Sequence, residues 1–136
     1  MGSAGSSKSY AITQKIIIRC CREPGIRVMV CRRYGTTIRQ TVFEVFKEIL
    51  RDWQLTQYVK INEGDFRIRF PNGSEIFFTG LDSEEKLLSL ANVSCIFVEE
   101  AYEVPKDIFE QLDLRMRGHV KNQQIIMAWN PISSQS

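Results

Sequence analysis

The sequence has little of the chemistry that marks zinc proteins, redox enzymes and histidine-dependent catalysts. It contains one histidine and four cysteines in 136 residues, and no two cysteines stand at the two-residue spacing of a zinc knuckle or a redox pair. We therefore expect reduced thiols that are mostly buried, at Cys20, Cys21, Cys31 and Cys95. The lone histidine, His119, has no catalytic partner in view, so we expect a surface role for it.

Long apolar segments and an excess of charge of one sign are also missing. The longest uncharged apolar stretch near the start is residues 16–18, far too short for a secretion signal or a membrane span. Lysine and arginine number 18 against 16 aspartate and glutamate, and a net charge of +2 is too small for a dedicated nucleic-acid binder. We therefore expect a soluble intracellular protein whose DNA affinity, if any, comes from local patches or from several copies together.

What is present is enough apolar material for one folded domain. The apolar fraction of 43% excludes intrinsic disorder, and 136 residues support one core but not two. The Gly/Ser-rich residues 2–7 and the polar residues 133–136 resemble cut edges of something larger. We expect residues 1–136 to form a single, partial domain.

Helical and strand patterns alternate along the chain, which favours an α/β fold with a mainly parallel sheet flanked by helices. The clearest helix is residues 38–53, capped by Thr37, whose Phe43, Phe46 and Trp53 lie at helical spacing and are expected in the core. The other expected helices cover residues 8–21, 82–90 and 105–116, and the expected strands cover residues 27–31, 95–98 and 124–129.

The spacing of apolar residues changes in the middle of the chain from the 3.6-residue repeat of a helix to the two-residue repeat of a strand. Residues 58–61, 66–70 and 75–78 alternate apolar and polar side chains, and residues 71–74 carry a strong turn signal. We expect an antiparallel hairpin at the edge of the sheet or inserted into it. Arg67 and Arg69 on one hairpin face have two open interpretations: contact with a DNA backbone, or simple solvation.

The first residues match the phosphate-loop pattern G-x-x-x-x-G-K-[ST] at every fixed position but one, where Ser7 replaces the second glycine. Backbone N–H groups of such a loop surround phosphate oxygens, the lysine reaches the β- and γ-phosphates, and the hydroxyl binds Mg²⁺. A helix after Lys8 would direct its positive N-terminal end at the anion. The nucleotide-binding candidates are Gly2, Ser3, Ala4, Gly5, Ser6, Ser7, Lys8 and Ser9. The alternative interpretation, a Gly/Ser linker, stays open for this segment taken alone.

Two apolar strands deliver polar residues at their carboxyl ends. Residues 95–98 lead into Glu99 and Glu100, and neighbouring side chains on a strand point to opposite faces, so the two carboxylates need separate roles. We assign Glu99 to the metal-water shell and Glu100 to polarising the attacking water. Residues 124–129 lead into Asn130, which we expect near the γ-phosphate because ligands lie beyond the carboxyl ends of parallel strands. The alternatives are a solvated acidic loop and an ordinary Asn-Pro turn.

Taken together, residues 2–9, 98–101 and 129–131, with residues 109–118 between them, resemble the ATPase domain of tailed-bacteriophage terminase large subunits. The resemblance covers essentially the whole chain, including residues 72–76 and 79–81. It implies a P-loop NTPase fold of the additional-strand, catalytic-Glu type and an ATP hydrolase that uses Mg²⁺. It also implies a motor that drives double-stranded DNA into procapsids, working in the host cytoplasm at the portal vertex as a ring of about five subunits. Portal protein and the small terminase subunit are the partners implied.

Carried over by the resemblance, Lys8 and Ser9 become phosphate and Mg²⁺ ligands, Glu99 the acidic metal position, Glu100 the catalytic carboxylate and Asn130 the coupling residue. The family usually has Asp where Glu99 stands, and the longer side chain favours a water-mediated metal contact.

Many members also carry an arginine at the position of Ala4, so the charge that stabilises the transition state must come from elsewhere. The candidates are Arg115 and Arg117, and after them Arg32 and Arg33; for each one a plain surface charge is the alternative.

The family's first strand and adenine-contacting segment would precede Met1, and its nuclease domain would follow Ser136, so we do not expect this chain to cut DNA. Two other functions stay open: a non-catalytic remnant that serves only in binding or assembly, and a helicase-like or recombinase-like P-loop ATPase.

Overall fold

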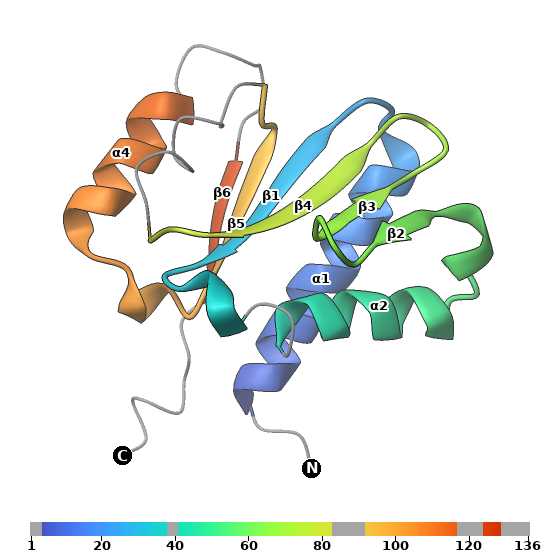
Figure 1. Cartoon of the computed structure of the whole chain (residues 1–136), viewed down its shortest axis with the longest axis horizontal. Helices are drawn as coiled ribbons and strands as arrows, with labels where there is room; N and C mark the ends of the chain where they lie inside the picture. The colour runs from blue at the N-terminus through green and yellow to red at the C-terminus, as the bar shows by residue number, and fades with distance from the viewer. Residues whose placement is uncertain (1–3, 38–40, 83–91, 117–123, 129–136) are drawn as a thin grey trace.

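The computed structural model describes residues 4–37, 41–82, 92–116 and 124–128. Helices and strands alternate as the sequence predicts (Figure 1). In chain order the elements are α1 (Ala4–Arg22), β1 (Arg27–Arg32), η1 (Gly35–Thr37), α2 (Val42–Asp52), η2 (Thr56–Tyr58), β2 (Lys60–Asn62), β3 (Arg67–Arg69), β4 (Glu75–Gly80), β5 (Cys95–Glu99), η3 (Ala101–Glu103), α4 (Lys106–Met116) and β6 (Gln124–Ala128).

The strands form one six-stranded sheet within the described residues, in the order β2-β3-β4-β1-β5-β6. β1 pairs in parallel with both β4 and β5, and β5 pairs in parallel with β6. Val28 opposite Cys95 and Cys31 opposite Val98 fix the register of the central pair. The carboxyl ends of these parallel strands therefore meet at one edge of the sheet, which confirms the mainly parallel α/β fold.

The antiparallel hairpin is confirmed at the other side of the sheet. β3 pairs antiparallel with β2 and with β4, and β4 continues into the parallel part beside β1. Gly73 has a φ of +92°, a conformation open to glycine, and its N–H donates to the Phe70 carbonyl at 3.0 Å. Ser74 Oγ donates to the Glu23 carbonyl at 2.6 Å, so the hairpin turn is fixed to the end of α1.

α1 and α2 cover one face of the sheet, where the larger of two cores lies (Figure 1). Phe43 and Phe46 are fully buried and meet Phe78 of β4 edge to face, with ring centroids 4.9 and 5.1 Å apart. Both are core residues as predicted. Trp53 is not: it follows the last residue of α2, and its side chain is 36% exposed.

α4 covers the opposite face and buries Leu112 against a second core. That core includes Met29 of β1 and Ile96 and Val98 of β5. All of β5 is buried because helices cover both of its faces, and this explains its continuous apolar sequence.

Three helix starts differ from the predictions. α1 begins at Ala4 rather than residue 8, so residues 4–7 of the Gly/Ser-rich segment belong to the helix. α2 begins at Val42, and Thr37 belongs to η1 instead of capping it; Thr41 stands at the cap position without a side-chain cap hydrogen bond. α4 begins at Lys106, so Pro105 directly precedes the helix and is not its first residue as predicted. The helix expected over residues 82–90 lies almost wholly outside the described residues.

None of the helices in the described ranges has the length and apolarity needed to cross a bilayer. The four cysteines are free thiols, and all but Cys21 are buried, as predicted. Burial raises the pKa of Cys20 to about 12.

Candidate functional site

The candidate site lies at the edge where the parallel strands end. β1 ends at Arg32 and β5 ends at Glu99, and the two strands are neighbours in the sheet. Ser9 of α1 reaches the same place, because its hydroxyl lies near enough to the Glu99 carboxylate to lower the Glu99 pKa. Two of the residues assigned to Mg²⁺ from distant parts of the sequence are thus brought together.

Glu99 is a buried carboxylate, 7% exposed. Burial raises its pKa above the ordinary value, since a low-dielectric environment disfavours the charged form, and the nearby Glu100 carboxylate acts in the same direction. The charge of Arg32 and the Ser9 hydroxyl oppose this rise without cancelling it. A cation beside Glu99 would hold it ionised.

Ser9 is held in the helix that follows the predicted phosphate loop. Its carbonyl accepts a hydrogen bond from Thr13 Oγ1 at 2.8 Å, and Thr13 is fully buried. Residues 4–7 of the predicted loop are helical as well. Gly2 and Ser3 lie outside the described residues, so the described backbone carries the end of the motif and not its beginning.

Glu100 occupies an unusual backbone conformation. Its φ of 55° and ψ of 49° are left-handed, a region that costs a residue with a side chain about 1–2 kcal/mol. β5 ends at Glu99, so the strand alternation expected for the two carboxylates stops there, and a left-handed turn directs Glu100 instead. Glu100 is half-buried, whereas Glu99 is buried. The two carboxylates therefore have different surroundings, as their separate predicted roles require.

Arg32 and Glu103 form the part of the site that the sequence indicates least. The Arg32 side chain is only 13% exposed; its Nη2 donates to Glu103 Oε1 at 3.4 Å, and its Nε lies 3.9 Å from Glu99 Oε1. Sequence reasoning ranks Arg32 as a second choice and misses Glu103. The only available signal for Glu103 is its position three residues after Glu100, which is the spacing of a 3₁₀ turn.

The other candidates are placed in part or not at all. Arg33 donates to the Leu81 carbonyl at 2.7 Å and lies over the Tyr34 ring, so its guanidinium is bound away from the carboxylates. Arg115 lies in the last turn of α4. Arg117, His119 and Asn130 lie outside the described residues.

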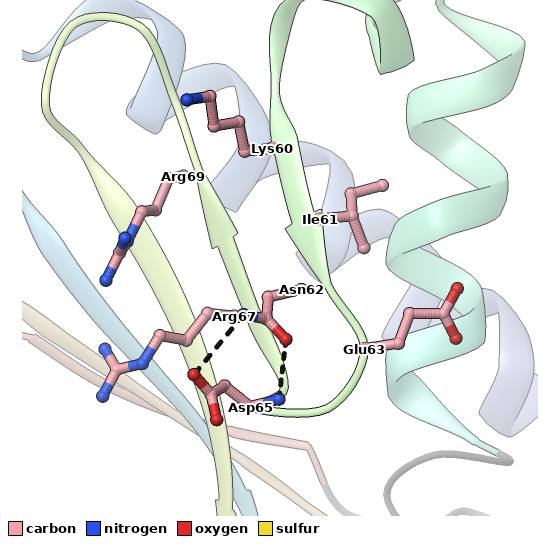
Figure 2. Close-up of a pocket in the computed structure, with 7 residues that line it drawn as sticks. All are labelled: Lys60, Ile61, Asn62, Glu63, Asp65, Arg67 and Arg69. Carbon is pink, nitrogen blue, oxygen red and sulfur yellow. Dashed lines mark hydrogen bonds between the residues drawn. The ribbon is translucent and has the colours of Figure 1, made fainter.

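The hairpin arginines pair with a carboxylate within their own sheet. Arg67 Nη1 lies 3.0 Å and Arg69 Nε 3.5 Å from Glu75, which also contacts Arg27 Nε at 2.9 Å. Figure 2 shows the two side chains on the same side of the hairpin, away from Glu63. Asn62 and Asp65 close the turn by two hydrogen bonds, including Asp65 N–H to Asn62 Oδ1 at 2.9 Å. These pairings agree with a charged surface that is partly neutralised locally.

The donor set fits a magnesium ion that keeps most of its water. Oε1 of Glu99 is buried and has no hydrogen-bond partner among the described residues, so one oxygen is left for a metal ion or for its water. The Ser9 hydroxyl lies near the same carboxylate. No group of three or more His, Cys, Asp or Glu side chains that could hold a metal ion occurs in the described part of the chain. Mg²⁺ commonly binds through one or two protein carboxylates together with waters and substrate phosphates.

Known proteins share both the sequence and this fold. A family model described as "Phage terminase large subunit" matches residues 1–136. The PBSX phage terminase large subunit of Bacillus subtilis (strain 168) is 34% identical over 134 residues, which is 98% of this chain and 31% of the relative. The chain thus spans about a third of the length of that curated relative.

Solved structures agree with these sequence matches. The large terminase of a thermophilic bacteriophage superposes with a TM-score of 0.73 at 14% identity, covering 99% of this chain and 35% of that one. A structure of the same protein in complex with ADP gives 0.71 at 15% identity, covering 93% and 32%. The matches over the full chain, in sequence and in fold, show that it belongs to the phage terminase large subunit family.

Proposed function

We propose that this chain carries the nucleotide site of a terminase ATPase, which powers the movement of double-stranded DNA into procapsids. The observation that carries the proposal is the proximity of the Ser9 hydroxyl to the Glu99 carboxylate at the carboxyl end of β5. These residues are far apart in the sequence, and the hydroxyl and the carboxylate are the two groups that a P-loop ATPase brings to its metal. The ADP complex of the thermophilic-phage terminase, which has the same fold, supports nucleotide as the ligand.

The residues of the loop would bind the phosphates. Backbone N–H groups of Gly2, Ser3, Ala4, Gly5, Ser6 and Ser7 would surround the phosphate oxygens, and Lys8 would contact the β- and γ-phosphates. Ser9 and Glu99 would hold Mg²⁺, Glu99 through a water because of its longer side chain. The ion, when bound, would neutralise charge on the phosphates as the terminal bond breaks.

Glu100 would act on the attacking water. A carboxylate accepts a proton, or a hydrogen bond, from a water and so raises its nucleophilicity. The left-handed backbone places Glu100 directly after Glu99, the proposed metal ligand, and turns the chain away from the direction of β5. Asn130, which follows the Gln124–Ala128 strand in the sequence, would contact the γ-phosphate and couple hydrolysis to movement.

The transition-state charge requires a further cation. Arg115 and Arg117 are our candidates, and the buried contact of Arg32 with two carboxylates favours a local role for Arg32 instead. P-loop NTPases receive such an arginine in cis or in trans, and we propose a neighbouring subunit of the ring as a second source.

The partners follow from the family. We propose a ring of about five subunits on the procapsid in the host cytoplasm, with portal protein, the small terminase subunit and double-stranded DNA as its partners. The chain's net charge of +2 predicts that most of the DNA grip comes from the ring and from parts of the relatives that this chain does not span.

The experiment compares hydrolysis and binding in matched variants. Glu100→Gln should abolish ATP turnover while ATP binding stays nearly intact, since it removes the proton acceptor and preserves size. Lys8→Ala should weaken Mg-ATP binding in calorimetry. Unchanged hydrolysis in Glu100→Gln would remove Glu100 from the mechanism.

One observation favours a second function, that of a non-catalytic remnant used only for binding or assembly. α1 begins at Ala4, so residues 4–7 are helical where a phosphate loop would curl around an anion. If the unmodified chain gives no heat with Mg-ATP, this second function is the better account.

A further inference from the structure

We propose that Glu103 is a positioning residue, which holds Arg32 away from Glu99 and so keeps one oxygen of that carboxylate open for a cation. The inference rests on the proposed function in one respect, namely that Glu99 faces a metal ion. The rest of it concerns only the described side chains.

The distances show how Arg32 is shared between the two carboxylates. Its Nη2 donates to Glu103 Oε1 at 3.4 Å, whereas its Nε stops 3.9 Å from Glu99 Oε1. The distance of 3.9 Å is beyond hydrogen-bond range. Arg32 Nε and Glu99 Oε1 are both buried, and neither has a hydrogen-bond partner among the described residues. A buried donor and a buried acceptor therefore form an ion pair here without a hydrogen bond.

Such an arrangement needs a force that opposes closure, because unsatisfied buried polar groups are costly. Glu103 supplies it by binding the neighbouring Nη2 on the same edge of the guanidinium, so that turning Nε toward Glu99 would lengthen the bond to Glu103. With the Arg32 side chain only 13% exposed, water is a poor substitute partner. We infer that the interaction of Glu103 with Arg32 prevents a hydrogen bond from forming between Arg32 Nε and Glu99 Oε1.

The turn that carries Glu103 is the one that presents Glu100. The Glu103 N–H donates to the Glu100 carbonyl at 2.9 Å, and the Val104 N–H donates to the Ala101 carbonyl at 3.0 Å. Movement of Glu100 would therefore move Glu103, and with it Arg32. Through this turn the proposed catalytic carboxylate and the proposed metal ligand are mechanically linked.

Removal of the Glu103 charge should let the bond close. In Glu103→Gln the guanidinium is held less strongly by Glu103, and the nearest unsatisfied acceptor is Glu99 Oε1. A cation must then displace Arg32 before it can approach, so its affinity falls. When Arg32 is absent, the same change at Glu103 has no guanidinium to release.

The test uses Mn²⁺ alone as the probe, in a double-mutant cycle on the full chain. Electron paramagnetic resonance should show Mn²⁺ affinity falling about three- to tenfold in Glu103→Gln and staying nearly constant when the same change is made in Arg32→Gln, as for residues of one ion-pair network. Glu63→Gln, which removes a surface partner of Lys47 near the far end of the sheet, is the control and should leave the affinity unchanged. Glu103→Asp keeps the charge and shortens the reach, so it should give a smaller fall.

A second readout needs no metal. The Arg32 Nε–H resonance in nitrogen-15 spectra should shift in Glu103→Gln and Glu103→Asp, because a new bond to Glu99 forms, and should not shift in Glu63→Gln. An unmoved resonance, or an equal loss of Mn²⁺ affinity with and without Arg32, overturns the proposal. Absence of Mn²⁺ binding in every variant and in the unmodified chain counts against the proposed function, and the resonance then decides the role of Glu103 by itself.

Discussion

The left-handed backbone at Glu100 can be tested by comparing alanine and glycine at that position. The residue has φ 55° and ψ 49°, a conformation that glycine adopts freely and alanine does not. Glu100→Ala and Glu100→Gly both delete the carboxylate and whatever the side chain contacts. The difference between the two variants therefore reports the backbone alone.

The expected difference follows from two opposing effects. Glycine avoids the cost of about 1–2 kcal/mol for a left-handed residue with a Cβ, and it loses about 0.4–1 kcal/mol through the greater freedom of the unfolded chain. Glu100→Gly should therefore be more stable than Glu100→Ala by roughly 0.5–1 kcal/mol. At Glu48, an exposed position within α2, the same comparison should have the opposite sign, with glycine about 1 kcal/mol less stable.

Urea unfolding followed by circular dichroism measures both pairs, provided that the dependence of the unfolding free energy on urea is the same for all four variants. A Glu100→Gly variant that is less stable than Glu100→Ala would refute the strained turn. It would also remove the physical reason for regarding the position of Glu100 as functionally constrained.

Further predictions concern charge, packing and thiol chemistry. Burial raises the pKa of Glu75, but the flanking arginines outweigh burial and hold that pKa below its usual range. The stability that the Glu75 carboxylate contributes is therefore present at neutral pH and is lost as the pH falls through the folded-state pKa. Glu75→Gln should flatten the acid side of a plot of unfolding free energy against pH, and an unchanged acid side would contradict the pairing. Gly80→Ala, at the end of β4, should lower the free energy of unfolding by about 1–3 kcal/mol, because a Cβ there would lie 2.7 Å from the Gly35 Cα. A calorimetric melting temperature equal to that of the unmodified chain would count against this close approach. In the folded chain a thiol reagent at pH 8 should modify the exposed Cys21 rapidly and the buried Cys20 slowly, since burial raises the Cys20 pKa to about 12; equal rates by mass spectrometry would contradict the buried placement.

The parallel sheet was predictable because its strands have continuous apolar sequences. The runs ending at Arg32 and Glu99 are buried between helices on both faces, and such burial leaves a pattern that a single sequence displays. The hairpin was predictable for a different reason, namely the turn signal of residues 71–74 between alternating segments. Because parallel strands share their carboxyl edge, the nearness of Glu99 to the end of β1 followed from the fold.

The contacts within the site were less predictable. The hydrogen bond between Arg32 and Glu103 joins residues 71 positions apart, and no local pattern specifies which arginine meets which carboxylate. The left-handed conformation at Glu100 was also not predictable, because no glycine occupies that position. The start of α1 could not be placed because glycine, serine and alanine in residues 2–7 fit both a loop and a helix end.

The central claim, that Ser9 and Glu99 together hold the metal of a bound nucleotide, is tested most directly by calorimetry of Mg-ATP binding. The unmodified chain, Ser9→Ala and Glu99→Gln would be titrated with Mg-ATP and then with ATP in the presence of EDTA. The account predicts binding of Mg-ATP by the unmodified chain, an affinity about tenfold lower in each variant, and no difference among the three proteins once the metal is removed. Absence of binding heat in the unmodified chain, or variants that bind Mg-ATP as tightly as it does, would contradict it.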